Sequence, residues 1–158
     1  MHQFRDACMH ATKETFKKQG AILPSATLLA PTGIHPVIFN GPLSATTKSK
    51  ISMFIHDAIR DLEATEMAFS MEAWTTNLAL CKRCLGAGDL GCADCSKGPR
   101  KEALCLTWST PKIEETWMAE VFRENGSVAA GEWAKQKIQP YSNSRFAHFF
   151  RKAWKAYN

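Results

Sequence analysis

Four cysteines within fifteen residues constrain the fold of this chain more than any other feature. Segment 81–95 reads CKRCLGAGDLGCADC, which is two CxxC pairs with seven residues between them. Because each CxxC pair can offer two thiolates to one metal ion, the segment predicts a tetrahedral structural zinc site. Its ligands would be Cys81, Cys84, Cys92 and Cys95. Two disulfides or four reduced thiols are the alternatives, although a CxxC pair more often forms a redox disulfide than a stable cross-link.

A site made of four thiolates leaves no coordination position for water or substrate, so the predicted zinc is structural and not catalytic. The first half of the segment, CKRCLGAG, resembles the CxxCxGxG repeats of J-domain (DnaJ-type) chaperones. That resemblance implies a shared zinc-knuckle geometry and no chaperone activity.

Length and composition are those of one globular domain, residues 1–158, which can bury a core without a metal. We therefore expect the zinc site to be an insertion on a folded domain. No apolar run approaches the roughly 18–20 residues of a membrane span. The first residues, MHQFRDACMHATKETFKKQG, lack the apolar core of a signal peptide. These features predict a cytoplasmic protein without membrane contact, in a compartment where thiols stay reduced.

Hydrophobic periodicity predicts an α+β fold: one mainly antiparallel sheet packed by helices, with the zinc-knuckle loop (81–95) inserted between two strands. The predicted helices span 2–19, 48–64 and 145–157, and the predicted strands span 26–30, 35–39, 66–76, 102–110, 115–124 and 127–136. The last helix lies in a basic and aromatic C-terminal segment, 141–158.

Two details of the strand pattern bear on the arrangement of the sheet. Pro36 has no backbone N–H to donate, so its strand should begin there or lie at an edge. In the strand 66–76, alternation should place Met67 and Phe69 on one face of the sheet and Ala68 and Ser70 on the other.

A longer resemblance covers residues 28–133. Its matching pieces are TLLAPTGIHPVIF, KSKISMFIHDAIRDLEAT, AFSMEAW and EALCLTWST. In these pieces the chain resembles a group of small bacterial and phage α+β proteins. The resemblance implies the hairpin, helix, strand, loop and strand order of the fold, and it implies no catalytic activity. It also suggests one specific role, that of a small phage-type inhibitor of a host defence system.

Catalytic motifs are missing from the sequence. It contains no GxSxG, HExxH or Walker loop, and its five histidines are scattered. Glu72 is the one carboxylate with a catalytic interpretation, because it follows apolar strand residues and a buried carboxylate has a raised pKa. The alternative is that Glu72 is exposed or paired. We therefore predict that the protein is not an enzyme.

The remaining chemistry favours a binding protein that contacts another macromolecule, most simply a protein. Net charge is +5, and basic residues gather around the predicted zinc loop and in the last helix. The contact residues suggested by this charge are Lys82, Arg83, Lys97, Arg100, Lys101, Arg151, Lys152 and Lys155. Nucleic-acid binding through the same residues is the alternative, with Trp133 and Trp154 as possible stacking side chains.

Overall fold

The computed structural model describes residues 2–40, 45–76, 100–136 and 154. Within these residues it contains two helices and one seven-stranded antiparallel sheet, which confirms the predicted α+β fold. The elements are α1 (Gln3–Gln19), β1 (Ser25–Ala30), β2 (Gly33–Ile38), α2 (Ala45–Leu62), β3 (Glu66–Thr76), β4 (Arg100–Ser109), β5 (Glu114–Glu124), β6 (Ser127–Ala130) and β7 (Ala134–Lys135).

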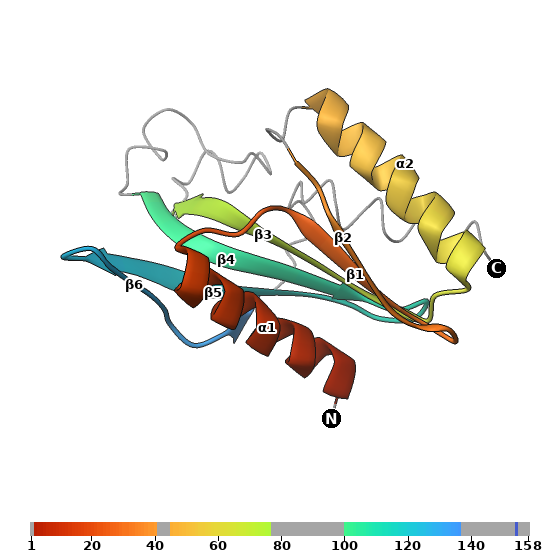
Figure 1. Cartoon of the computed structure of the whole chain (residues 1–158), viewed down its shortest axis with the longest axis horizontal. Coiled ribbons are helices and arrows are strands. Elements are labelled where there is room, and N and C mark those ends of the chain that lie inside the picture. Colours follow the sequence, from red (N-terminus) through yellow and green to blue (C-terminus); the bar gives the residue numbers. More distant parts are fainter. Residues whose placement is uncertain (1, 41–44, 77–99, 137–153, 155–158) are drawn as a thin grey trace, which may run out of the picture.

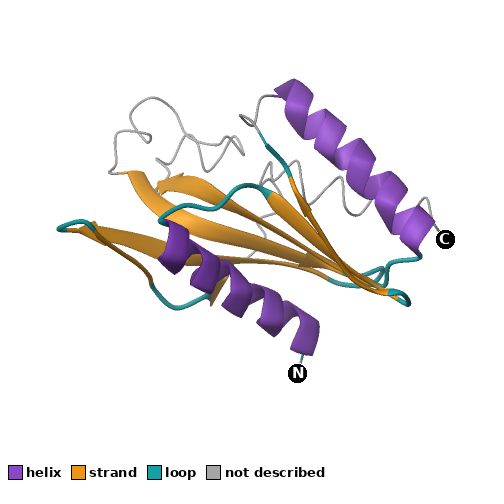
Figure 2. Ribbon diagram, in the orientation of Figure 1, coloured by secondary structure: helices purple, strands orange, loops and turns teal. Residues whose placement is uncertain are grey.

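The strands lie in the order β2-β1-β3-β4-β5-β6, and β7 also pairs with β5. β2 therefore ends the described sheet, and the position of Pro36 in this terminal strand confirms the edge predicted from it. Helix α1 packs on one face of the sheet and α2 packs on the other (Figures 1 and 2). The long crossover through α2 returns the chain to the sheet beside β1 and not beside β2.

The predicted return strand 127–136 is in fact two short strands. Val121 pairs with Ala130 and Met118 pairs with Ala134, so three residues of the returning chain face two residues of β5. One extra residue of this kind is a β-bulge, which interrupts the ladder and bends the strand. Hydrophobic alternation alone gave no sign of the bulge. The preceding Asn125-Gly126 turn has positive φ at both residues, as a two-residue hairpin of this composition requires.

The core on the α2 face is closed. The stripe Ile51, Ile55 and Ile59 of α2 packs on Leu28 and Phe69 of the sheet. Trp154 completes this cluster, and its Nε1–H donates to the buried Ser109 Oγ at 2.7 Å. The other residues of the predicted C-terminal helix lie outside the described part of the chain.

The core on the α1 face has two clusters. At one end of α1, Phe4 and Met9 pack with Leu106 and Trp108, and at the other end Phe16 packs with Leu104, Ala119 and Val121. These partners belong to β4 and β5, with Ala68 of β3 beside them. Helix α1 consequently covers β3 to β6 on this face, with Leu29 of β1 at the margin of the covered area. The rest of the same face of β1 and β2, beside α1, is left uncovered.

Candidate binding groove

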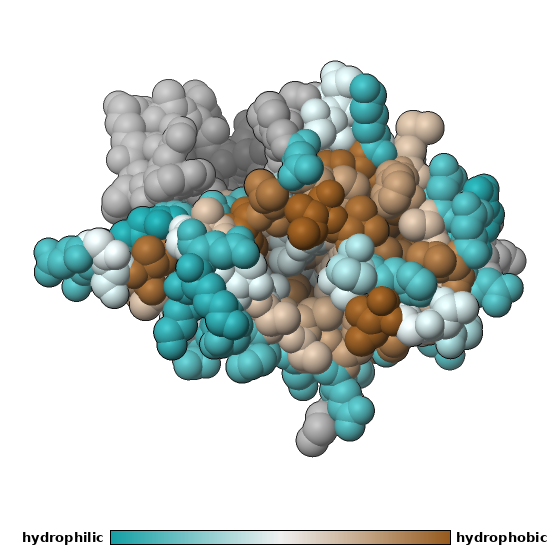
Figure 3. Space-filling model, viewed as in Figure 1, coloured by the Kyte–Doolittle hydropathy of each residue, from teal (hydrophilic) through white to brown (hydrophobic). Residues whose placement is uncertain are grey.

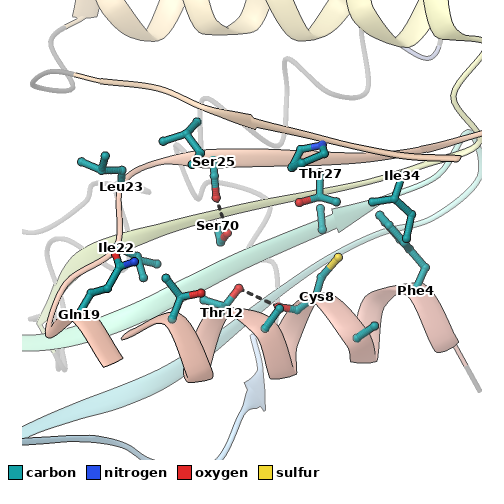
Figure 4. A pocket seen from close by; sticks show the side chains of 16 residues that line it. Phe4, Cys8, Thr12, Gln19, Ile22, Leu23, Ser25, Thr27, Ile34 and Ser70 are labelled. Atoms are coloured by element: carbon teal, nitrogen blue, oxygen red, sulfur yellow. Dashed lines mark hydrogen bonds between the residues drawn. The ribbon is translucent and has the colours of Figure 1, made fainter. Parts of the chain in front are cut away.

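The uncovered strip beside α1 is a groove. The cavity that runs along the length of α1, called the main cavity below, has a volume of about 390 Å³ and lies between α1 and the β1–β2 hairpin. A second hollow of about 550 Å³ at the N-terminal end of α1 shares Phe4, Ala7 and Ile34 with the first. Figure 4 shows α1 as one wall and the hairpin as the other, with Phe4 and Ile34 at one end and Gln19 and Leu23 at the other. The two hollows form one continuous groove along α1.

The helix wall of the groove has a small-residue surface. Ala7, Ala11 and Thr15 recur at every fourth position, and all three are exposed. Residues four apart lie on one face of a helix. The spacing therefore produces a low ridge against which another element can approach closely.

The sheet wall carries exposed apolar side chains. Ile34 is 62% exposed and Ile38 is 63% exposed, and Leu23 beside them is 52% exposed. Hydrophobic residues gather in the hollow between α1 and the hairpin in the space-filling view (Figure 3). Single exposed apolar residues are ordinary. Three of them lining one concave surface make it a candidate contact site.

Three of the hydroxyl groups that line the groove are hydrogen-bonded within the protein. Ser25 and Ser70 hydroxyls lie 3.1 Å apart in a hydrogen bond, and the Thr12 hydroxyl donates to the Cys8 carbonyl at 2.8 Å. No charged side chain is among the described residues that line the main cavity. The floor is therefore neutral and suited to an apolar occupant.

The Cys8 side chain points into the groove (Figure 4), but its thiol is a poor nucleophile at neutral pH. Burial, together with the nearby Glu66 carboxylate, raises the pKa of its thiol to about 11. The thiolate is the nucleophilic form of cysteine, and at neutral pH this thiol stays protonated. Cys8 therefore contributes volume and polarisability to the groove.

The outer edge of β2 borders the groove. Phe39 donates its N–H to the Pro24 carbonyl at 2.8 Å, which fixes the phase of the β1–β2 ladder. Bonded and non-bonded pairs alternate along an antiparallel ladder. The backbone groups of His35 and Val37 thus face β1, and those of Ile34, Pro36 and Ile38 face outward.

Most of the predicted metal ligands and contact residues lie outside the described part of the chain. This holds for the four cysteines and for Lys82, Arg83 and Lys97, and for the C-terminal Arg151, Lys152 and Lys155. Arg100 lies at the start of β4, where it pairs with Thr76 at the end of β3. Segment 77–99 thus connects two neighbouring antiparallel strands. Lys101 forms an ion pair with Glu120 at 3.2 Å.

Among the described residues, no group of His, Cys, Asp and Glu side chains could hold a metal ion. The zinc-site spacing read from the sequence is that of the four cysteines of segment 81–95, which lies outside the described residues.

Glu72 has a structural partner. Its Oε1 accepts the backbone N–H of Ile22 at 3.0 Å, which holds the loop after α1 against the sheet. Glu72 does not line either groove cavity. These contacts agree with the alternative that the Glu72 carboxylate is paired. None of them supports a catalytic role.

The aromatic and basic residues also pack into the fold. Trp154 is only 3% exposed, which leaves it no free face for a nucleic-acid base. Arg5 lies over Trp117 at 4.9 Å and pairs with Glu115 at 3.0 Å. Arg123 pairs with Glu102, and this hydrogen bond lowers the pKa of the Glu102 carboxyl. The described cations are thus largely balanced by carboxylates.

No protein-family model, no curated protein and no solved structure matches this chain. The resemblance to small bacterial and phage proteins accordingly stays a prediction. Neither of the described helices is long and apolar enough to cross a membrane. The groove is a site that sequence reasoning missed; the one signal for it was the run of Ile34, Pro36 and Ile38 on a single face of an edge strand.

Proposed function

We propose that this chain is a non-enzymatic, zinc-stabilised binding protein, and that the groove between α1 and the β1–β2 hairpin receives an apolar segment of a protein partner. The observation that carries the proposal is the exposed apolar lining of this concave surface, formed by Leu23, Ile34 and Ile38. Full burial of such a side chain is worth roughly 1.5–3 kcal/mol. Because these three side chains are still at least half exposed in the folded protein, a part of that free energy is available for binding.

The chemistry of the groove supports a binding role over a catalytic one. General acid–base catalysis needs a titratable side chain within hydrogen-bond reach of the reacting group. The lining of the main cavity consists of apolar side chains, hydroxyls, one amide and the protonated thiol of Cys8. Such a surface can position a ligand by shape and apolar contact.

Two observations support the structural zinc. The CxxC pairs have the ligand number and spacing of a closed zinc site. The segment that contains them starts and ends at Thr76 and Arg100, which lie opposite each other. A loop with adjacent ends must fold back on itself, and a metal site of two knuckles stabilises such a loop.

Nucleic-acid binding remains the competing proposal, and the described residues favour it less. Lys101, Arg123 and Lys135 each pair with a carboxylate, which reduces the positive field that phosphates would meet. A nucleic-acid interface would depend on the basic residues of segments 77–99 and 137–158.

Photo-crosslinking tests the proposal. A benzoyl-phenylalanine at position 34 places the reactive group in the groove, and the same group at position 53, on the exposed side of α2, is the control. Because Met53 is 69% exposed, both positions are accessible. In nuclease-treated host lysate we expect a discrete protein adduct from position 34 that is missing from position 53. Equal adducts at both positions, or no protein adduct at position 34, would contradict the proposal, and an adduct lost on nuclease treatment would favour nucleic acid.

A further inference from the structure

The outer edge of β2 is unsuited to an added strand. Ile34, Pro36 and Ile38 direct their backbone groups away from β1, so a partner strand would have to bond to these three residues. Pro36 lacks the N–H, and its ring occupies the space where the neighbouring carbonyl would approach. Proline at an outward position is a common protection of sheet edges. The middle of this edge is therefore blocked to strand pairing.

The groove has the width of one helix. Neighbouring strands lie about 4.8 Å apart, so the uncovered pair β1 and β2 forms a strip about 10 Å wide. Packed helices have axes about 8–10 Å apart. The strip is therefore wide enough for one helix beside α1.

The length of the groove also fits a helix. Its lining runs along α1 from Phe4 to Gln19. The 17 residues of α1 extend about 25 Å at 1.5 Å per residue. An occupant helix of about 12 to 16 residues would span this length. The small Ala7, Ala11 and Thr15 permit its close approach, and Ile34 and Ile38 meet its other side.

The charges at the two ends of α1 favour one direction for the occupant. Lys18 lies in the last turn of α1, three residues after Thr15, and so continues the ridge of Ala7, Ala11 and Thr15, and Glu66 lines the groove at the opposite end. Helices are stabilised by acidic residues at the N-terminus and basic residues at the C-terminus. An antiparallel helix charged in this way places its acidic end near Lys18 and its basic end near Glu66.

From these four features we infer that the groove recognises an amphipathic helix of a partner protein, antiparallel to α1, with an acidic first turn and a basic last turn. This inference rests on the proposed function and specifies the form of the partner. Trp154 of this chain is buried on the opposite face of the sheet, against Ser109, and so is not the occupant.

A yeast-displayed library of 16-residue peptides tests the inference. Half of the library fixes leucines at helical spacing and half fixes them at alternating spacing, with the other positions random. Sorting against the full-length protein should enrich the helical half, with Asp and Glu in the first turn and Lys and Arg in the last. Enrichment of the alternating half, of the reversed charge order, or of neither half would overturn it.

Matched variants locate the binding. Ile38→Asp should weaken the selected peptides by roughly tenfold or more, since it places a charge in the apolar contact. Met53→Asp makes the same change on an equally exposed part of α2 and should leave affinity unchanged. Equal binding by both variants would overturn the inference. So would a dimer of the wild-type protein that Ile38→Asp converts to a monomer, because the occupant would then be a second copy. An adduct from position 34 without helical enrichment would refute the helix and leave the proposed function standing.

Discussion

The two faces of the sheet differ in how completely they are covered. On the α2 face, Ile51, Ile55 and Ile59 are almost fully buried, and Trp154 fills the remaining space. On the α1 face, one helix covers the central strands, and Ile34 and Ile38 stay largely exposed beside it. The closed face stabilises the fold. The half-covered face leaves apolar side chains exposed to solvent, and a binding partner can bury them.

Exposure alone does not separate the two faces. Met53 on α2 is 69% exposed, which is comparable to the 62% and 63% of Ile34 and Ile38, and Phe54 is 49% exposed. Neither Met53 nor Phe54 lines the two groove cavities, however, whereas Ile34 and Ile38 lie along the main one. Concavity lets one partner segment contact several apolar side chains at once, and this explains why the groove, and not the α2 surface, is the candidate site.

Removal of Trp154 should have the largest effect on stability, and it tests whether the α2 face is closed. Trp154→Ala should lower the free energy of unfolding by about 3–5 kcal/mol, because it opens a cavity in a packed cluster. Trp154→Phe keeps most of the packing and loses the hydrogen bond to Ser109, so about 1–2 kcal/mol is expected. Urea denaturation measures both. A loss below about 1 kcal/mol for Trp154→Ala would show that this face is not closed.

Neighbouring residues of β1 provide a direct contrast between the faces. Ala26 points into the closed cluster and is fully buried, and Thr27 lines the groove. Ala26→Phe should cost about 1–3 kcal/mol through overpacking, whereas Thr27→Phe should cost less because the cavity can receive the ring. Thermal unfolding of the two variants compares them. Equal losses would mean that the groove is as tightly packed as the core.

Zinc removal should affect the connection between β3 and β4 more than either face. Freshly purified protein should contain about one equivalent of zinc, and Cys92→Ser should abolish it. The near-ultraviolet circular dichroism of the core tryptophans should largely persist, because Trp108 and Trp154 are packed by the sheet and helices. Elemental analysis that finds less than about half an equivalent of zinc would contradict the predicted site.

Most of the fold was predictable because periodicity reports burial on each element. The alternation in 66–76 placed Met67 and Phe69 opposite to Ala68, as the two core clusters confirm. Pro36 predicted an edge strand because proline has no backbone N–H to donate to a neighbouring strand. The groove was not predictable, since it depends on where α1 lies across the sheet, and that position follows from the sum of long-range contacts. The bulge at 131–133 likewise depends on pairing with β5.

The smallest expected difference between the two faces concerns the reactivity of the two free cysteines among the described residues, Cys8 and Cys105. Burial raises the pKa of both thiols to about 11, with Cys8 in the groove and Cys105 on the other face. Near pH 8 both should react slowly with iodoacetamide, with a thiolate fraction roughly a hundredfold below that of an ordinary thiol. Towards pH 11, Cys8 should react first, because the reagent can enter the groove. Site-resolved mass spectrometry measures the rates, and faster modification of Cys105 would contradict the openness of the α1 face.

Isoleucine methyl NMR tests the central claim most directly, because isoleucines mark both faces. Ile34 and Ile38 report on the groove, and Ile51, Ile55 and Ile59 report on the closed core. The titrant is the protein segment recovered by crosslinking at position 34. The groove methyls should shift or broaden in proportion to occupancy, and the core methyls should stay in place. Perturbation of the core methyls with unchanged Ile34 and Ile38 signals would contradict the claim that the half-covered face is the binding face.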